Sequence, residues 1–188
     1  MLLSQKYLTL EKLLGSVPHA SALKKLWADH RQLMESAPGS SHNHQAWPGG
    51  YKDHVVECLN IANQLYSTLS DLRSVPFSRS EALEVMFLHD IEKPFKSGDD
   101  LSYPGKCPWL ATKENRRQFR SDVIAKYGIT LTPEQENALR YVEGVPDSEY
   151  TPGERTMGEL AAFCHCCDIL SARLWHDKGN KVPAPDWE

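Results

Sequence analysis

The chain has 188 residues, of which 40% are hydrophobic and 24% are charged. This length and composition predict one globular domain, spanning 1–188, that can bury its own core. No apolar run approaches the ~20 residues of a membrane helix, and no secretory signal is evident, so we expect a soluble, cytoplasmic protein without a membrane partner. The formal net charge of -4 argues against a protein that grips long nucleic acid, which normally presents a basic face.

The first forty residues predict two short amphipathic helices, at about 4–14 and 20–36. Each has apolar side chains along one stripe, so we expect both to cover a larger helical core. Prolines and glycines then break the chain, the second time at 48–50. A long helix is predicted to follow at about 51–72, with His54 in its first turn.

The next predicted elements are a helix at about 80–90 and a loop at 95–110. A serine with an acid near the first turn marks the start of this helix, and Pro94 cannot continue it undisturbed. The loop is dense in Gly, Pro, Asp and Ser. It directly follows the pair His89-Asp90, in a position where active-site walls are often built.

Three further helices are predicted in the last third of the chain. In the middle helix, Thr132 is predicted to be the N-cap and Pro133 the first helical residue. No alternating strand pattern interrupts the series, so the sequence predicts an all-α fold. The expected ranges are 113–127, 133–143 and, after a loop at 145–153, 154–175.

Five cysteines occur, three of them within 164–167. The odd count, the apolar helical setting and the lack of a secretory signal favour reduced, buried thiols that pack as small hydrophobes. Cys58 and Cys107 stand alone, without the paired spacing of a structural zinc site, so no cysteine zinc site is expected.

Four residues with metal-ligating side chains sit in or beside apolar helical runs: His54, the pair His89-Asp90, and Asp168. A bare carboxylate in the apolar segment around Asp168 would be costly unless it pairs, takes up a proton or binds a metal. An ion pair with Arg155 or Arg173 is the structural alternative. Metal ligation is favoured because it also accounts for the two histidines and the second aspartate.

The order of these residues resembles the HD-domain superfamily of metal-dependent phosphohydrolases. A first His follows a Gly-Gly turn, a His-Asp pair closes an apolar helix and a lone Asp lies on a late helix. Lys93 and Pro94 follow the pair as in the branch that reads His-Asp-x-x-Lys. The resemblance covers the core 41–175, leaves 1–40 unplaced, and implies an HD-domain helical bundle whose ligands are His54, His89, Asp90 and Asp168.

Two imidazoles and two carboxylates form a mixed nitrogen and oxygen set that suits Mn, Fe, Co, Ni, Zn or Mg, so the sequence leaves the divalent metal unidentified. Such a site can activate water for attack on phosphorus. The expected catalytic residues are Asp90 and Lys93. Helical spacing turns Lys93 toward the metal pair, and the resemblance implies a role at the scissile phosphate, with a solvated lysine as the alternative.

Further candidates for substrate binding carry an ordinary structural alternative. Trp47 could stack on a base or pack over the helix start, and His44 and His165 could line the pocket or be exposed and satisfied elsewhere. Four basic residues share one helix face and could bind phosphate or be solvated: Lys113, Arg116, Arg117 and Arg120.

These features predict a metal-dependent phosphohydrolase that acts on nucleotides, either nucleoside monophosphates or triphosphates, or on another small phosphoester. A 3′-5′ exonuclease and a cyclic nucleotide or dinucleotide phosphodiesterase are the alternative enzymes. A nucleotide-binding or sequestering module that has lost catalysis is the alternative outside enzymes. The sequence does not distinguish the substrate, the metal or the oligomeric state.

Overall fold

The computed structural model describes residues 7–40, 44–97 and 108–174 of the chain. Within these ranges every regular element is a helix and no strand occurs, so the predicted all-α class is confirmed. None of the helices described is both long enough and apolar enough to span a membrane.

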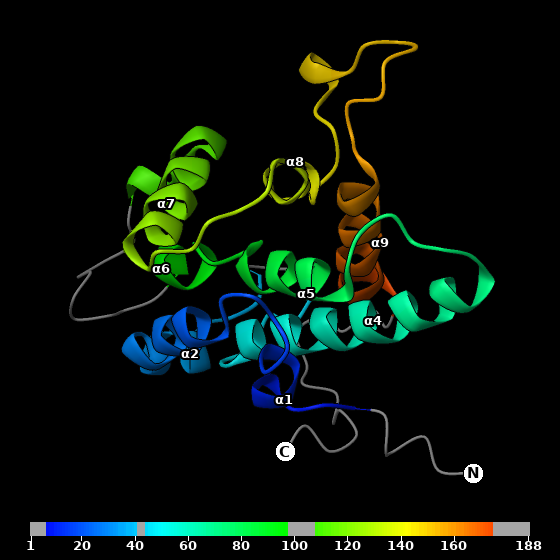
Figure 1. Ribbon diagram of the computed structural model, residues 1–188. Coiled ribbons are helices and arrows are strands. Elements are labelled where there is room, and N and C mark those ends of the chain that lie inside the picture. The colour runs from blue at the N-terminus through cyan, green and yellow to red at the C-terminus, as the bar shows by residue number, and fades with distance from the viewer. Residues whose placement is uncertain (1–6, 41–43, 98–107, 175–188) are drawn as a thin grey trace.

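Three helices form the centre of the molecule. The longest, α4 (Gly50–Leu72), extends along its lower side with α5 (Arg79–Leu88) beside it, and α9 (Glu159–Arg173) crosses near both (Figure 1). All seven residues of α5 from Ala82 to Leu88 are buried, which explains why its sequence lacks a polar face. Helix α8 (Pro133–Tyr141) packs on α9 and α5 of this group.

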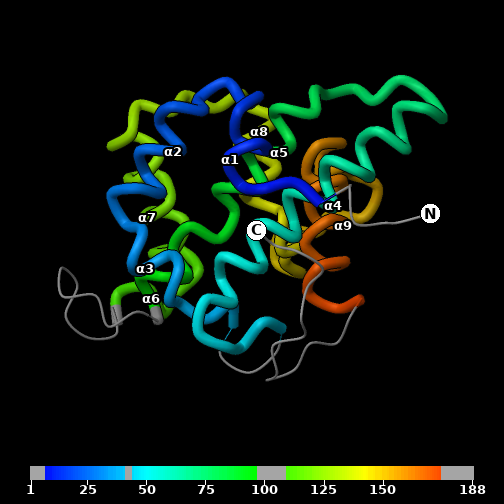
Figure 2. Tube along the Cα trace, turned by 90° about the horizontal axis from the view of Figure 1, so that it is seen from below, coloured from blue at the N-terminus to red at the C-terminus, as the bar shows by residue number. Residues whose placement is uncertain are grey.

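The N-terminal helices pack against α4 and α5, in agreement with the predicted cover of a larger helical core. They are α1 (Leu10–Leu14), α2 (Ala20–Asp29) and α3 (Arg31–Ser36) (Figure 2). Leu23 and Leu26 of α2 are fully buried, so the predicted apolar stripe faces the core. On the same side of the molecule lie α6 (Lys93–Ser97) and α7 (Lys113–Lys126), with a short 3-10 turn, η2 (Pro108–Ala111), packed against both.

A buried carboxylate ties the N-terminal segment to the central helices. Glu84 of α5 is fully buried, and its Oε1 accepts hydrogen bonds from the backbone N–H (3.2 Å) and Nδ1 (2.8 Å) of His19, which precedes α2. Its Oε2 accepts from Nε2 of Gln135 on α8 at 2.9 Å. Both carboxylate oxygens are therefore satisfied within the protein, and three separate elements depend on one side chain.

Local capping explains where α5 and α8 begin. Ser78 and Glu81 form a reciprocal capping box before α5, and Thr132 and Gln135 form another before α8, where Pro133 occupies the first turn. Helix α5 ends at Leu88, two residues earlier than predicted. The pair His89-Asp90 consequently lies in the tight turn between α5 and α6 rather than inside a helix.

Several predicted boundaries are wrong for reasons that involve distant contacts. The helix expected at 20–36 is broken at His30, whose backbone leaves the helical region and whose ring packs edge-on against Phe95 at 5.0 Å. The last helix begins at Glu159 instead of 154, because the N–H of Gly158 is bound by the side-chain oxygen of Asn137 at 2.9 Å.

Smaller differences concern the first helix and the loops. The first helix starts at Leu10, capped by Thr9. The predicted loop at 95–110 contains parts of α6 and η2, and its remaining residues lie outside the described part of the chain. The loop at 145–153 contains one short 3-10 turn, η3 (Asp147–Glu149). The predicted tail also lies outside the described residues.

Candidate metal centre

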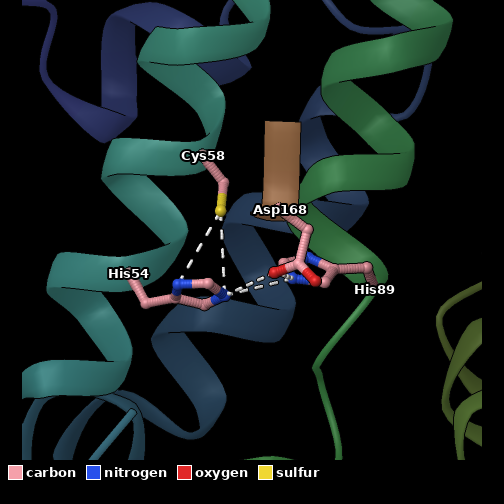
Figure 3. A group of neighbouring side chains, drawn as sticks. All are labelled: His54, Cys58, His89 and Asp168. Carbon is pink, nitrogen blue, oxygen red and sulfur yellow. Dashed lines mark hydrogen bonds and ion pairs between the residues drawn. The ribbon is translucent and has the colours of Figure 1, made fainter. Parts of the chain in front are cut away.

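Three helices bring four metal-ligating side chains together at the centre of the fold. His54 and Cys58 come from the N-terminal part of α4, His89 from the end of α5 and Asp168 from α9, and all four point toward one another (Figure 3). Their ligand atoms all lie within 4.8 Å of one another. The group could hold a metal ion, and three of its members are fully or almost fully shielded from solvent.

The spacing of these atoms is that of ligands around one ion. His54 Nε2 lies 3.3 Å from both His89 Nε2 and Asp168 Oδ1, and His89 Nε2 lies 3.6 Å from Asp168 Oδ1. Two ligands bound at about 2.1 Å are about 3.0 Å apart at a right angle and about 3.4 Å apart at the tetrahedral angle. The observed distances therefore leave room for a single cation at their common centre.

Asp90 joins the same group. Its Oδ2 lies 3.3 Å from His54 Nε2 and 3.2 Å from His89 Nε2, and its side chain is almost completely buried. The four ligands predicted from the sequence thus lie in one place. Asp168 is not paired with arginine in this arrangement: its ion-pair partners are the two histidines, and Arg155 pairs with Glu159 at 3.0 Å.

Hydrogen bonds outside the group determine which histidine nitrogens face its centre. His89 Nδ1 lies 2.7 Å from the carbonyl oxygen of Met86, and since a carbonyl can only accept, Nδ1 carries the proton of this bond. Ser171 donates its hydroxyl proton to Glu57 Oε2 at 2.6 Å, so it accepts from His54 Nδ1 at 3.1 Å. Both Nε2 lone pairs are then available for a cation.

The pKa values of the histidine and the two carboxyl groups also favour a cation at the centre of the group. Burial alone would lower the pKa of His89, but the neighbouring carboxylates of Asp90 and Asp168 raise it to about 10. Both carboxyl groups are held well below their usual pKa, although burial opposes this, because the histidines stabilise their ionised forms. Two buried carboxylates therefore require positive charge between them, which a divalent cation supplies in place of protons.

Two glycines allow the chain to turn tightly into α4. The sequence predicted a turn at these residues but not the contact that it makes. Gly49 has a φ of +84°, a conformation that side chains disfavour, and a Cβ on Gly50 would collide with the carbonyl of Gln45. Gln45 itself is buried and donates from Nε2 to Glu57 Oε2 at 2.7 Å. The close approach at Gly50 therefore brings Gln45 against the carboxylate that supports His54 through Ser171.

Cys58 is the member of the group that sequence reasoning missed. Its sulfur lies 3.8 Å from Nδ1 and 3.7 Å from Nε2 of His54, one helical turn earlier. Burial and the negative charge of Asp168 raise the pKa of the thiol well above its ordinary value. The signal in the sequence is the i, i+4 spacing of His54 and Cys58, which places both on one face of a helix.

The other cysteines of the described residues are free thiols. Cys164 and Cys167 are buried, as expected, but Cys166 is exposed because it lies on the opposite side of α9. Cys107 lies outside the described part of the chain.

Lys93 lies where helical spacing predicts, with its ammonium group in direct contact with Asp90 Oδ2. Its side chain is 25% exposed, so the ammonium group adjoins the metal-ligating group without being sealed from solvent. This contact also helps to lower the pKa of Asp90, after the larger effect of His89. A positively charged ammonium group therefore lies beside the carboxylate of Asp90.

His44 also lies beside the centre. Its ring packs against that of His54 with centroids 5.0 Å apart, and its Nε2 is buried with no hydrogen-bond partner among the described residues. Burial, together with the electrostatic influence of His54 and the positive charge of Lys93, lowers the pKa of His44 to about 4. At neutral pH it is an uncharged imidazole with a nitrogen still to be satisfied.

The remaining candidates for substrate binding use their polar atoms elsewhere. Trp47 donates from Nε1 to Asp53 Oδ2 at 2.8 Å, in the first turn of α4. His165 Nδ1 donates to the carbonyl of Val142, at the end of α8, at 2.6 Å. These contacts fit the structural alternative that the sequence left open for each residue.

The basic face of α7 divides between two sets of contacts. Arg116 donates to the carbonyl of Thr112 at 3.3 Å, and Arg117 lies 3.6 Å from Glu149 Oε1. Arg120, which the sequence grouped with them, reaches the carbonyl oxygen of His89. Arg117 and Arg120 also line a groove of about 640 Å³ between α7 and α8. Of these three, only Arg120 contacts the turn that carries the predicted metal pair.

Comparisons with known proteins identify no relative of this chain. It matches no protein-family model, no curated protein and no solved structure. The features that indicate a function are the chemistry of the residues gathered around His54 and the order of those residues along the sequence.

Proposed function

We propose that this protein is a metal-dependent phosphohydrolase of the HD type that acts on nucleotides. The observation that carries the proposal is the convergence of His54, His89, Asp90 and Asp168. The carboxylate oxygens of Asp90 and Asp168 lie 3.2 to 3.6 Å from the Nε2 atoms of the two histidines. Their order along the chain supports the HD type. The group is compatible with such a site, and the helical fold agrees with it.

The donor set suits phosphoester hydrolysis. A divalent cation held by these residues would supply Lewis acidity and would lower the pKa of water at the site. His54 and His89 are held in the correct tautomers by Ser171 and by the carbonyl of Met86, so they need no rearrangement to bind the cation. Such preorganisation lowers the cost of placing charge in a buried site.

The residues at the edge of the group have complementary tasks in this proposal. Lys93, which is partly exposed, is available to bind a non-bridging phosphate oxygen and to share the negative charge that develops during displacement. His44 offers an unsatisfied Nε2 to a substrate oxygen or to water. Asp90 links the candidate metal site to Lys93, because its Oδ2 faces His54 and His89 as well as the ammonium group.

Free nucleotides are the proposed substrates, in preference to polynucleotides. The formal net charge of the chain is -4, and the basic face of α7 spans about two helical turns, or roughly 11 Å. Arg117 is already paired with Glu149, which reduces the positive charge available to a long strand. A mononucleotide needs contacts only at its phosphate and its base.

The test uses the full chain, freed of metal and then loaded in parallel with Mn, Co, Ni, Zn or Mg. Each form is incubated with nucleoside monophosphates, nucleoside triphosphates, cyclic dinucleotides and a labelled oligonucleotide, and the products are identified by mass. We expect inorganic phosphate or pyrophosphate from a free nucleotide. Faster cleavage of the oligonucleotide would replace the proposal with a nuclease, and tight nucleotide binding without product would favour a sequestering module.

A further inference from the structure

Cys58 lies within the metal group, although nothing in the proposed ligand set requires a thiol. It is fully buried on α4, one helical turn beyond His54, with its sulfur 3.7 Å from His54 Nε2 (Figure 3). All ligand atoms of the group that contains Cys58, His89 and Asp168 lie within 4.8 Å of one another. The sulfur is therefore as much a part of the group as the carboxylate.

These distances fit a sulfur ligand. A thiolate binds zinc at about 2.3 Å and an imidazole binds it at about 2.0 to 2.1 Å, which separates the two ligand atoms by about 3.5 Å at the tetrahedral angle. The observed separation between Sγ and His54 Nε2 is 3.7 Å. A change of a few tenths of an ångström would bring the sulfur into the coordination sphere, well within what one side-chain torsion provides.

The environment of Asp90 strengthens the case for a further ligand. Its Oδ2 is in contact with the ammonium group of Lys93 as well as near both histidines. A carboxylate oxygen shared with a lysine gives less charge to a metal than an unshared one. The sulfur of Cys58, on α4, instead lies against the imidazole of His54.

We propose that Cys58 is a thiolate ligand of the metal centre and that it biases the centre toward zinc, cobalt or another metal that accepts sulfur, and away from magnesium. The inference rests on the metal-binding part of the proposed function, but not on the reaction or its substrate. On binding, the thiol proton passes to solvent as the metal–sulfur bond forms, and no oxidant or reductant is involved. Thiolate ligands select such metals because magnesium prefers oxygen.

The alternative is that Cys58 only packs over the face of the His54 imidazole. Its sulfur is almost equidistant from the two ring nitrogens, at 3.8 Å and 3.7 Å, which is also the geometry of a thiol resting on the ring. The two interpretations differ in one observable. Only a ligand forms a metal–sulfur bond.

Cobalt(II) substitution of the full chain tests this directly. We expect the cobalt-loaded wild type to show a near-ultraviolet charge-transfer band from sulfur to cobalt, which nitrogen and oxygen ligands do not produce. Cys58→Ser should retain about one bound cobalt by elemental analysis but lose the band. Cys164→Ser is the matched control, since it removes another buried thiol and should leave the band unchanged.

A measurement on the unaltered protein avoids dependence on the folding of a variant. X-ray absorption of the zinc-loaded wild type should require one sulfur at about 2.3 Å in addition to nitrogen and oxygen. Cys58→Ser, if folded by circular dichroism, should bind zinc at least about 10-fold more weakly while its weaker affinity for magnesium changes little.

The outcomes separate this inference from the proposed function. Metal bound without a sulfur signal would overturn the assignment of Cys58 and leave the phosphohydrolase proposal intact. A sulfur signal without hydrolysis of any phosphoester would do the reverse. If the wild type bound none of the metals, both would be wrong.

Discussion

Ser171 on α9 donates a 2.6 Å hydrogen bond to Glu57 on α4, although the two residues are 114 positions apart in the sequence. Because the hydroxyl has only one proton, this bond obliges Ser171 to accept from Nδ1 of His54. The pair therefore fixes the tautomer of His54, a candidate metal ligand. It also joins the two helices that carry His54 and Asp168.

Replacement of Ser171 by alanine should weaken metal binding without removing a ligand. His54 would lose the acceptor that orients it, and supporting residues of this kind contribute about 10- to 100-fold to metal affinity. Competition with a coloured chelator measures the change. Ser67→Ala, on the exposed part of α4, is the control and should have no effect. Equal affinities in all three proteins would mean that His54 is oriented by other contacts.

Removal of ligands should abolish metal binding. We expect Asp168→Ala and the double variant His89→Ala/Asp90→Ala to lose stoichiometric metal and phosphohydrolase activity while circular dichroism stays helical. Elemental analysis after gel filtration decides the point. Asp53→Asn provides the control, because this carboxylate neighbours His54 in sequence but accepts its hydrogen bond from Trp47. Full metal content in the folded ligand variants would contradict the assigned centre.

Lys93→Ala should separate catalysis from metal binding. The ammonium group beside Asp90 is proposed to share charge on the phosphate, so its loss should lower kcat/KM by on the order of 10- to 1000-fold. Metal content should not fall. Lys96→Ala, three residues later and exposed on the same short helix, should behave as the wild type. Unaltered kinetics for Lys93→Ala would assign that lysine a role in packing only.

Glu84→Ala should destabilise the whole fold. The substitution leaves the part-buried donors of His19 and the buried amide of Gln135 without their acceptor, and loss of a buried charged partner typically costs about 3 kcal/mol or more. Urea denaturation of the metal-free protein gives the free energy of unfolding. Glu81→Ala, which removes only the side chain of an exposed cap, should cost about 1 kcal/mol. If Glu84→Ala lowered the free energy of unfolding by less than this control does, Glu84 would not hold the N-terminal segment and α8 to α5.

Acid should loosen the loop around η3. Glu149 accepts from Nε and Nη2 of Arg140 at 3.0 and 2.9 Å and from the hydroxyl of Tyr141 at 2.9 Å, and these bonds lower its pKa from 4.5. A lowered carboxyl pKa means that the stabilisation is present above the unfolded value and is lost as pH falls through the folded one. Protection of 145–153 should therefore decrease as pH falls below the ordinary glutamate value of 4.5.

Hydrogen exchange, corrected for the intrinsic rate at each pH, measures this protection. Glu149→Gln should already lack it at neutral pH and should show a smaller pH effect than the wild type. Glu154→Gln changes an exposed carboxylate just beyond the same loop and should keep the wild-type profile. Identical profiles for all three proteins would show that Arg140 does not hold the loop through Glu149.

The parts of the fold that the sequence predicted correctly depend on neighbouring residues. The capping boxes at Ser78 and Thr132 are formed by side chains three positions apart, so their pattern is legible in the chain. The candidate ligands can be recognised in the sequence for a related reason. A charged or imidazole side chain within an apolar run needs a partner, and this need marks His54, His89, Asp90 and Asp168 before any contact is known.

The parts that it did not predict depend on contacts between distant segments. The break at His30 accompanies packing against Phe95, and the late start of α9 depends on Asn137. Cys58 was read as an inert thiol because its chemistry follows from the position of the centre relative to α4. That position is known only when α5 and α9 are placed against the helix.

The candidate ligands belong to the same helices that build the core, so metal binding and folding should be coupled. An ion that binds only the folded chain adds RT ln(1 + [L]/Kd) to its stability, so the melting temperature should rise with free metal concentration. The coupling is reciprocal. Leu83→Ala would leave a cavity in the buried part of α5, six residues before His89, and the resulting loss of stability should be measured as weaker metal retention although no candidate ligand is changed.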